Sequence, residues 1–142
     1  VLGLASMTVL FMATTLLLGA NWGPPLYVAA LCASAVIAAM GISMLVCTFA
    51  RTDEQAAGWN AMIAITFAIL GGAMVPLTQA PELLRLAGRI TPHAWFLEAI
   101  DNMSAASTTF GDILPAIAVL IGFGVAAGAI AMARAPQFLV AR

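Results

Sequence analysis

The chain has 142 residues, 63% of them hydrophobic, with five Arg, six Asp or Glu, no Lys and a formal net charge of −1. Charged residues make up 8% of the chain, whereas soluble domains contain about 25%. This composition predicts a membrane protein and argues against a soluble helix bundle, which would show a polar stripe at helical spacing. The charge balance provides no basic surface, so nucleic acid is not an expected partner.

Three stretches carry no charge, namely 1–50, 55–81 and 113–133, and each reaches the roughly 20 residues that cross a bilayer core. The first is too long for one span, and its turn-forming sequence NWGPP at 21–25 would divide it. Pro25 suits the entry to the second span, because the first helical position needs no N–H donor. We therefore predict one transmembrane domain over 1–142, with spans at about 1–20, 26–50, 55–75 and 113–133.

Four spans would place both chain ends on one side of the membrane, together with a short polar turn at Arg51, Asp53 and Glu54. The NWGPP turn and the segment 76–112 would lie on the other side. The first side would hold three Arg residues and the second two, which are Arg51, Arg134 and Arg142 against Arg85 and Arg89. The positive-inside rule then favours a cytoplasmic first side, and we predict a multi-pass protein of the cell inner (plasma) membrane.

The segment 76–112 holds most of the charge and contains two short helical patterns. In PELLRLAGRI at 81–90, Glu82, Arg85 and Arg89 recur on one helix face. In TPHAWFLEAIDNM at 91–103, Thr91 is a candidate N-cap and Pro92 a candidate first helical residue. Neither pattern is long enough to cross a bilayer, so we predict a pair of re-entrant or interfacial helices at the outer face. An amphipathic loop that merely anchors two spans would show the same pattern.

Small and polar residues within the spans favour close helix packing. Gly124 and Gly128 have GxxxG spacing, and Gly122 also keeps the last span thin, as required where helices associate in lipid. They would form either a dimer face or an ordinary contact within one subunit. Asn60 lies near the expected cytoplasmic end of the third span, where interfacial anchoring is favoured over substrate contact.

Groups that could carry enzyme chemistry are scarce. A phosphate loop of the GxxxxGK[ST] type needs a Lys, which the chain lacks. The single His is distant in sequence from Cys32 and Cys47, so no metal site is predicted. We therefore expect no catalytic residue and no cofactor bound by the chain itself. A membrane enzyme or electron carrier would need paired His ligands or a buried acid with a nucleophile, and this composition disfavours it.

Several features follow one another in a definite order: a span ending in GGAMVPL, the Pro-bracketed piece QAPELLRLAGRI, then TPHAWFLEAI, and a last apolar span. This order resembles the carboxyl half of an ABC-2 type transporter permease. ARTDEQA at 50–56 is similar to the short cytoplasmic turn between the family's fourth and fifth spans. The resemblance implies an all-α integral membrane fold, in which the four spans correspond to the family's third to sixth. The family's first two spans, and the elbow that contacts its ATPase, would not be in this chain.

The same resemblance implies a function. We expect a permease subunit of an ATP-driven exporter, paired with a second permease subunit as a homo- or heterodimer and embedded in membrane lipid. The ABC ATPase partner would bind ATP and Mg. The cargo would be a hydrophobic or amphipathic compound, such as a drug, a lipid or a polymer-like molecule, as in multidrug efflux.

The outer pair at 81–103 would act as the gate. The candidate gate or substrate-path residues are Pro92, His93, Trp95, Glu98 and Asp101. Simpler roles remain open, because His93 could be an interfacial polar residue, while Glu98 and Asp101 could form a solvated edge instead of a cation site. The alternative function is a structural or assembly subunit without a transport path. Copurification of an ATPase would distinguish the two.

Overall fold

The computed structural model describes residues 2–74, 80–104 and 108–140, and every regular element in these ranges is an α-helix. The all-helical prediction is therefore confirmed for the described part of the chain. The helices in chain order are α1 (Leu2–Leu18), α2 (Pro25–Cys47), α3 (Asp53–Leu70), α4 (Glu82–Gly88), α5 (Pro92–Met103) and α6 (Phe110–Val140).

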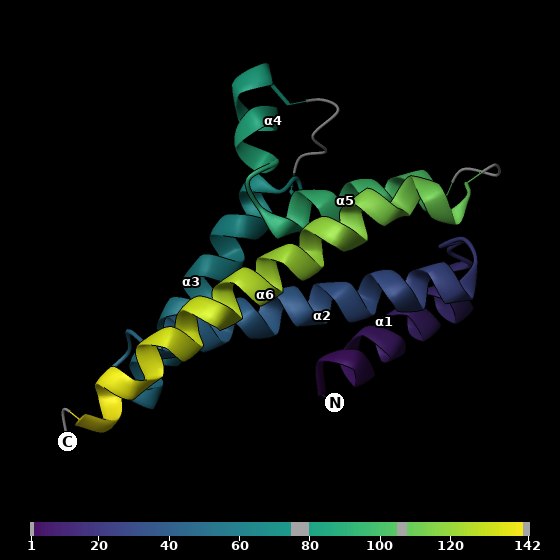
Figure 1. Cartoon of the computed structure of the whole chain (residues 1–142). Helices are drawn as coiled ribbons and strands as arrows, with labels where there is room; N and C mark the ends of the chain where they lie inside the picture. The colour runs from purple at the N-terminus through teal and green to yellow at the C-terminus, as the bar shows by residue number, and fades with distance from the viewer. Residues whose placement is uncertain (1, 75–79, 105–107, 141–142) are drawn as a thin grey trace.

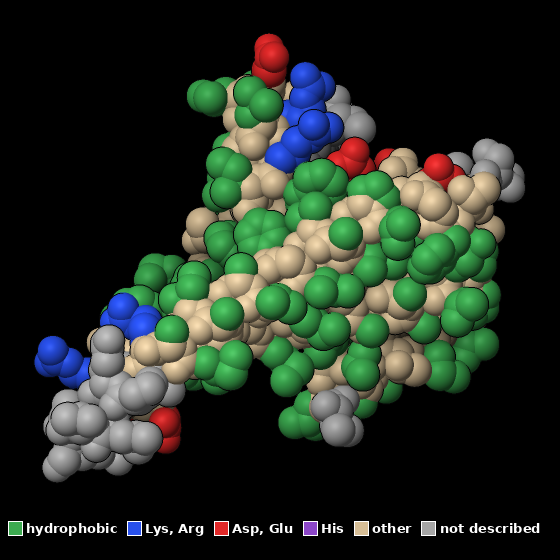
Figure 2. Space-filling view, viewed as in Figure 1, with side chains coloured by type: hydrophobic (Ala, Val, Ile, Leu, Met, Phe, Trp, Pro, Cys, Tyr) green, Lys and Arg blue, Asp and Glu red, His purple; other side chains and the backbone are tan. Residues whose placement is uncertain are grey.

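Two of the described helices are long and apolar enough to cross a membrane, namely α2 and the part of α6 over Phe110–Arg134. The helix α1 is apolar but has only 17 residues, and α3 opens with Asp53 and Glu54, which lower its mean hydropathy. Spans at α1 and α3 thus stay predictions. On the face in Figure 2, charged side chains gather over α4 and α5 and near the end of α6, with hydrophobic side chains between.

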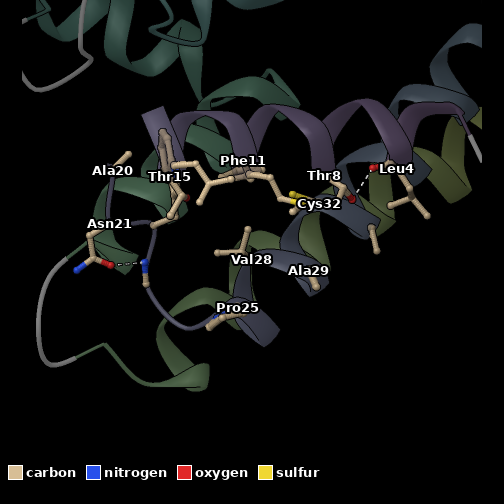
Figure 3. Close-up of a pocket in the computed structure, with 15 residues that line it drawn as sticks. Leu4, Thr8, Phe11, Thr15, Ala20, Asn21, Pro25, Val28, Ala29 and Cys32 are labelled. Carbon is tan, nitrogen blue, oxygen red and sulfur yellow. Dashed lines mark hydrogen bonds between the residues drawn. The ribbon is translucent and has the colours of Figure 1, made fainter. Parts of the chain in front are cut away.

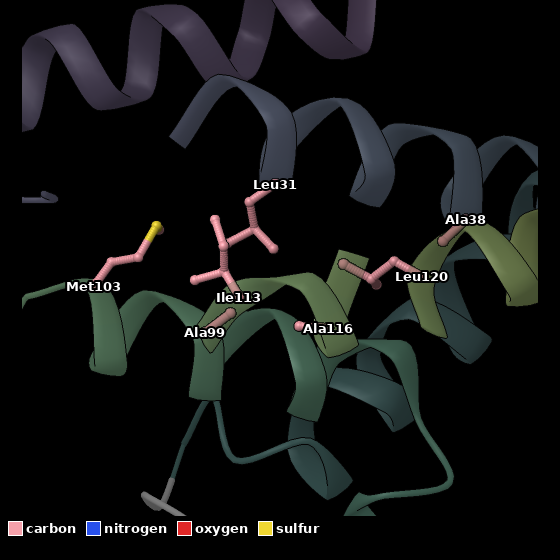
Figure 4. Close-up of a cluster of buried hydrophobic side chains, with 7 residues drawn as sticks. All are labelled: Leu31, Ala38, Ala99, Met103, Ile113, Ala116 and Leu120. Carbon is pink, nitrogen blue, oxygen red and sulfur yellow. The ribbon is translucent and has the colours of Figure 1, made fainter. Parts of the chain in front are cut away.

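The helices α2 and α6 form the centre of the fold, where they run side by side in the same direction (Figure 1). The helix α5 lies along the first half of α6, and α4 projects from the bundle. A core of apolar side chains joins three helices (Figure 4): Leu31 and Ala38 from α2, Ala99 and Met103 from α5, and Ile113, Ala116 and Leu120 from α6.

One face of α6 is buried against this core. Its buried residues recur three or four positions apart, as expected for one helix face: Ile113, Ala116, Leu120, Gly124, Ala127 and Ala131. Of the glycines expected to pack, only Gly124 lies against α2, where a β carbon would meet the backbone of Ile37. A β carbon on Gly122 or Gly128 would meet open space, so this chain alone gives those two no close helix partner.

Helix ends depart from the expected spans for local reasons. The helix α3 begins at Asp53 because the Thr52 hydroxyl caps it, accepting from the Gln55 N–H at 3.2 Å. Asp53 and Glu54, which we expected in the polar turn, therefore lie in the first turn of α3. Their negative charges are favourable there, next to the positive end of the helix dipole. The helix ends at Leu70 before Gly72, whose φ of 95° leaves the helical region. Val75 and Pro76, where we expected the span to end, lie outside the described residues.

The helix α6 is longer than the expected span. We expected Arg134 and Pro136 to close it, but it continues through both to Val140. A proline inside a helix removes one backbone donor and usually kinks or breaks the helix. Membrane helices tolerate proline where neighbouring groups satisfy the freed backbone groups. At its other end α6 begins at Phe110, where Asp112 accepts from the backbone N–H and the hydroxyl of Thr109, both at 2.8 Å. Arg142, which we counted on the cytoplasmic side, lies outside the described residues.

Candidate functional site

The start of α5 is fixed by Thr91, the predicted N-cap. Its buried side chain accepts from the Ala94 N–H at 3.4 Å and donates to the Gly88 carbonyl at 2.8 Å. Pro92 occupies the first turn, where its missing N–H costs nothing. Because Gly88 is the last residue of α4, one hydroxyl ties the two short helices together. The segment 81–103 therefore forms two short helices, as the sequence predicts, and the Thr91 hydroxyl links them.

The end of α3 touches the start of α5. A β carbon added to Gly71 would lie 2.5 Å from the His93 Cβ, so only glycine permits this approach. The imidazole of His93 lies edge-on to the ring of Phe67, with 6.4 Å between ring centroids. Burial at this contact lowers the pKa of His93, because the charged imidazolium is poorly solvated there.

The remaining candidate gate residues lie elsewhere on α5. Trp95 is half-buried, and its indole N–H donates to the Arg89 carbonyl at 2.9 Å, which adds a second link between the two short helices. Glu98 and Asp101 are exposed. The structure thus places Pro92 and His93 toward α3, while the two acids face outward.

Contacts at the two ends of α2 define two ends of the bundle. Gly23 of the NWGPP turn has a φ of 85°, and a β carbon there would lie 2.6 Å from the Met103 carbonyl oxygen. The turn therefore packs on the end of α5. At the opposite end of α2, the guanidinium of Arg134 lies over the Phe49 ring, with 4.1 Å from Cζ to the ring centroid. The C-terminal end of α5 and the NWGPP turn thus share one end of the bundle, and Arg134 of α6 lies at the other.

The polar turn before α3 is organised by hydrogen bonds. The Arg51 backbone N–H donates to Gln55 Oε1 at 2.7 Å. Glu54 is fully exposed, and hydrogen bonds from its own backbone N–H and from the Thr52 hydroxyl lower its pKa. Arg51, Asp53 and Glu54 are all exposed, so this end is available to a partner protein.

A cavity of about 330 Å³ lies where α2, α3 and α5 meet. Pro92 and His93 line it, whereas Trp95, Glu98 and Asp101 do not. Asn60, which we expected at the membrane interface, also lines it. The α3 residues that line the cavity follow the spacing i, i+3, i+4, i+7 of one helix face, and they are Asn60, Ile63, Ala64 and Phe67. That spacing was visible in the sequence, but the partner faces on α2 and α5 were not.

A larger hollow of about 730 Å³ separates α1 from α2 (Figure 3). Phe11 and Thr8 line it from α1, and Val28 and Cys32 line it from α2. No described residue of α1 is buried, and most of this helix's contacts with other helices are with α2. The helix α1 therefore presents most of its apolar surface to lipid or to another chain.

The described ranges 2–74, 80–104 and 108–140 also bear on metal binding. Within them, no three His, Cys, Asp or Glu side chains come close enough to bind an ion. Of the two free cysteines, Cys32 is buried and Cys47 is exposed.

Comparison with known proteins identifies the family. Residues 1–103 match the family model described as ABC-2 type transporter. The chain belongs to this family. It is also 25% identical over 123 residues to the linearmycin resistance permease protein LnrN of Bacillus subtilis strain 168, an alignment that covers 87% of this chain and 32% of that protein. No solved structure matches the chain.

The ABC-2 type transporter family consists of membrane permeases, which are not enzymes themselves. Permeases of the family normally work with an ATPase partner. The matched region ends at Met103, so it includes both short helices of the outer pair and leaves α6 outside. The chain spans about a third of the length of the relative it matches.

Proposed function

We propose that the chain forms part of an export permease that moves a hydrophobic or amphipathic compound, such as a drug, a lipid or a polymer-like molecule, out of the cell. The observation that carries the proposal is the family match, which includes α1, α2, α3 and the two short helices of the outer pair. The name of the Bacillus subtilis relative, a resistance permease, favours outward movement of a drug-like compound.

The arrangement of the helices supports a multi-pass topology in the cell inner (plasma) membrane. In this proposal α1, α2, α3 and α6 all span the bilayer, and the outer pair lies at the external face. Two contacts agree with it, because Gly23 packs on Met103 at one end of the bundle and Phe49 on Arg134 at the other. Exposed charges at Arg51, Asp53 and Glu54 would then face the cytoplasm.

The chain would need two kinds of partner. An ABC ATPase, which binds ATP and Mg, would supply the energy, and a second permease subunit, identical or different, would complete the path. The unburied apolar surface of α1 is large enough to require cover by lipid or protein.

The outer pair would act as the gate. Thr91 and Trp95 link α5 to α4 by hydrogen bonds, so the two short helices would move together. The contact of Gly71 with His93 would couple that movement to α3, whose other end carries the polar turn. A change in packing at the cytoplasmic end could thereby reach the external face.

Purification of the protein from its native membrane tests the proposed function. We expect an ATPase with a phosphate loop to copurify, and its turnover to rise when the permease is reconstituted with a drug-like compound. Purification without an ATPase, or turnover that does not respond to the permease or the compound, would instead favour a structural or assembly subunit.

Two substitutions test the gate. Pro92→Ala alters the buried start of α5, and Glu98→Gln removes an exposed charge from its outer edge. We expect both to reduce transport far more than membrane insertion, with transport measured in cells and insertion by the amount of protein in the membrane. Equal losses of transport and insertion would show that the pair only anchors its neighbouring spans.

A further inference from the structure

The hydroxyl groups of the apolar helices differ in whether they already have a hydrogen-bond partner, and this difference identifies a group in the cavity between α2, α3 and α5 that could bind a ligand. Most of them donate to a carbonyl one turn back, as the structure shows for Ser6, Thr8, Thr14, Ser34, Thr48 and Thr66. Ser43 and Thr15 make no such bond to any described residue, and each lines a cavity. The Ser43 hydroxyl can therefore serve a ligand without losing a bond within its own helix.

Asn60 and His93 add further unused hydrogen-bonding capacity. The Asn60 amide donates from Nδ2 to the Ala56 carbonyl at 3.0 Å, which leaves its Oδ1 without a partner among the described residues. Ser43 and Asn60 both lie within about two helical turns of the connection between α2 and α3. They therefore sit at one end of the cavity, while His93, beside the end of α3, lies at the other.

The rest of the lining is apolar and uncharged. Ile63, Phe67, Phe96 and Leu97 contribute aliphatic and aromatic walls, and no Asp, Glu or Arg is among the residues that line the cavity. An ion without a countercharge is costly to move into such a site. A ligand that fits must therefore be neutral in its buried part.

The volume limits the size of that ligand. The cavity holds about 330 Å³, which is roughly twice the ~150 Å³ that accommodates one benzene ring in an apolar protein interior. Two fused aromatic rings, or a short branched alkyl group, would fill it.

We propose that this cavity binds a neutral, largely apolar molecule of about two fused rings, or the matching part of a larger one, whose hydroxyl or amide group hydrogen bonds with Ser43 and Asn60. The apolar body lies between α3 and α5, against Phe67 and Phe96, and extends toward His93. Binding itself needs no transport. The claim that such a ligand is cargo rests on the proposed function.

The test uses the full protein in lipid nanodiscs, with tritiated 1-naphthol and tritiated naphthalene as probes and protein-free nanodiscs as the blank. We expect saturable 1-naphthol binding above the blank. Ser43→Ala should weaken 1-naphthol by about threefold to tenfold, the usual effect of losing one hydrogen bond, and leave naphthalene binding unchanged. Equal changes for both probes would contradict the assigned hydrogen bond.

A pair of matched variants tests the location. Ala64 and Ala61 are both exposed residues of α3, but only Ala64 lines the cavity. Ala64→Phe should place a ring in the cavity and reduce 1-naphthol binding at least tenfold, whereas Ala61→Phe should leave it unchanged. No saturable binding, or equal effects of the two variants, would overturn the proposal.

A separate measurement isolates the proposed function. If binding follows the predicted pattern but 1-naphthol does not change the turnover of the copurified ATPase, the binding site is supported and its role in export is contradicted. If ATPase turnover responds to other drug-like compounds but Ala64→Phe leaves 1-naphthol binding intact, the export function is supported and this binding site is contradicted.

Discussion

Gly41 of α2 and Gly124 of α6 meet backbone to backbone. A β carbon added to Gly41 would come within 2.1 Å of the Gly124 carbonyl oxygen, and one added to Gly124 within 2.5 Å of the Ile37 carbonyl oxygen. Both glycines are buried, and the nearest atom in each case is a backbone carbonyl oxygen, which cannot move aside as a side chain can. Close approach of this kind is what holds helices together in lipid, where the hydrophobic effect between them is absent.

We expect Gly41→Ala and Gly124→Ala each to destabilise the fold by about 1–3 kcal/mol, the usual range for overpacking. Unfolding by denaturing detergent, followed by circular dichroism, measures the loss. Gly122→Ala and Gly128→Ala are matched controls on α6, because a β carbon at either position meets nothing within 4 Å. Equal losses at all four positions would show that the effect is not due to contact between α2 and α6.

The burial of His93 predicts a dependence of stability on pH. Its pKa lies below the ordinary value of 6.5 in the folded chain, so the unfolded chain binds the proton more readily. Lowering the pH from about 8 to about 5 should therefore destabilise the fold, and the loss should begin as the pH falls through the unfolded pKa of about 6.5. Thermal unfolding in detergent at a series of pH values measures it.

The control for this pH effect is His93→Gln, which is polar and cannot take up the proton. Its unfolding midpoint should change less between those pH values than that of the parent chain. Glu54 does not interfere, because its pKa is lowered from 4.5, and the stabilisation linked to that shift is lost as the pH falls from about 4.5 toward the lowered value, below the range tested. An unchanged pH profile in His93→Gln would mean that another group titrates.

The contact of Arg134 with Phe49 predicts a stabilising interaction at the end of the bundle opposite the NWGPP turn. Within the described residues, Arg134 Nε is buried without a hydrogen-bond partner, so the aromatic ring is the compensating contact found for this cation. Phe49→Leu should lower the free energy of unfolding by about 0.5–2 kcal/mol. Phe49→Trp should retain most of the stabilisation, because the ring face of Trp attracts cations as that of Phe does. A double-mutant cycle with Arg134→Gln isolates the pair, and a coupling energy of zero would refute it.

Local backbone chemistry was readable from the sequence. The break at NWGPP, the entry of α2 at Pro25 and the cap at Thr91 followed from residue types whose dihedral and hydrogen-bonding preferences act within a few positions. The same reasoning failed at Pro136, since the cost of one missing donor does not decide whether a helix ends.

Contacts between distant segments were not readable in the same way. The sequence drew attention to Gly124 through its GxxxG spacing with Gly128, yet the contact in the structure is with Gly41 on another helix. Asn60 was placed at the interface because of its position along α3, and only the packing of α2 and α5 shows that it faces a cavity. Such pairings depend on how helices are rotated against one another, which periodicity alone does not fix.

The most direct test of the proposed topology compares two exposed positions, Asp101 on α5 and Arg51 before α3. In full-length protein with Cys32 and Cys47 replaced by Ala, Asp101→Cys and Arg51→Cys would each be treated with a membrane-impermeant maleimide in intact cells. We predict that Asp101→Cys is labelled at once and Arg51→Cys only after the membrane is permeabilised. Labelling of both positions from the same side would contradict an outer pair opposite a cytoplasmic turn, and the exporter proposal would fall with it.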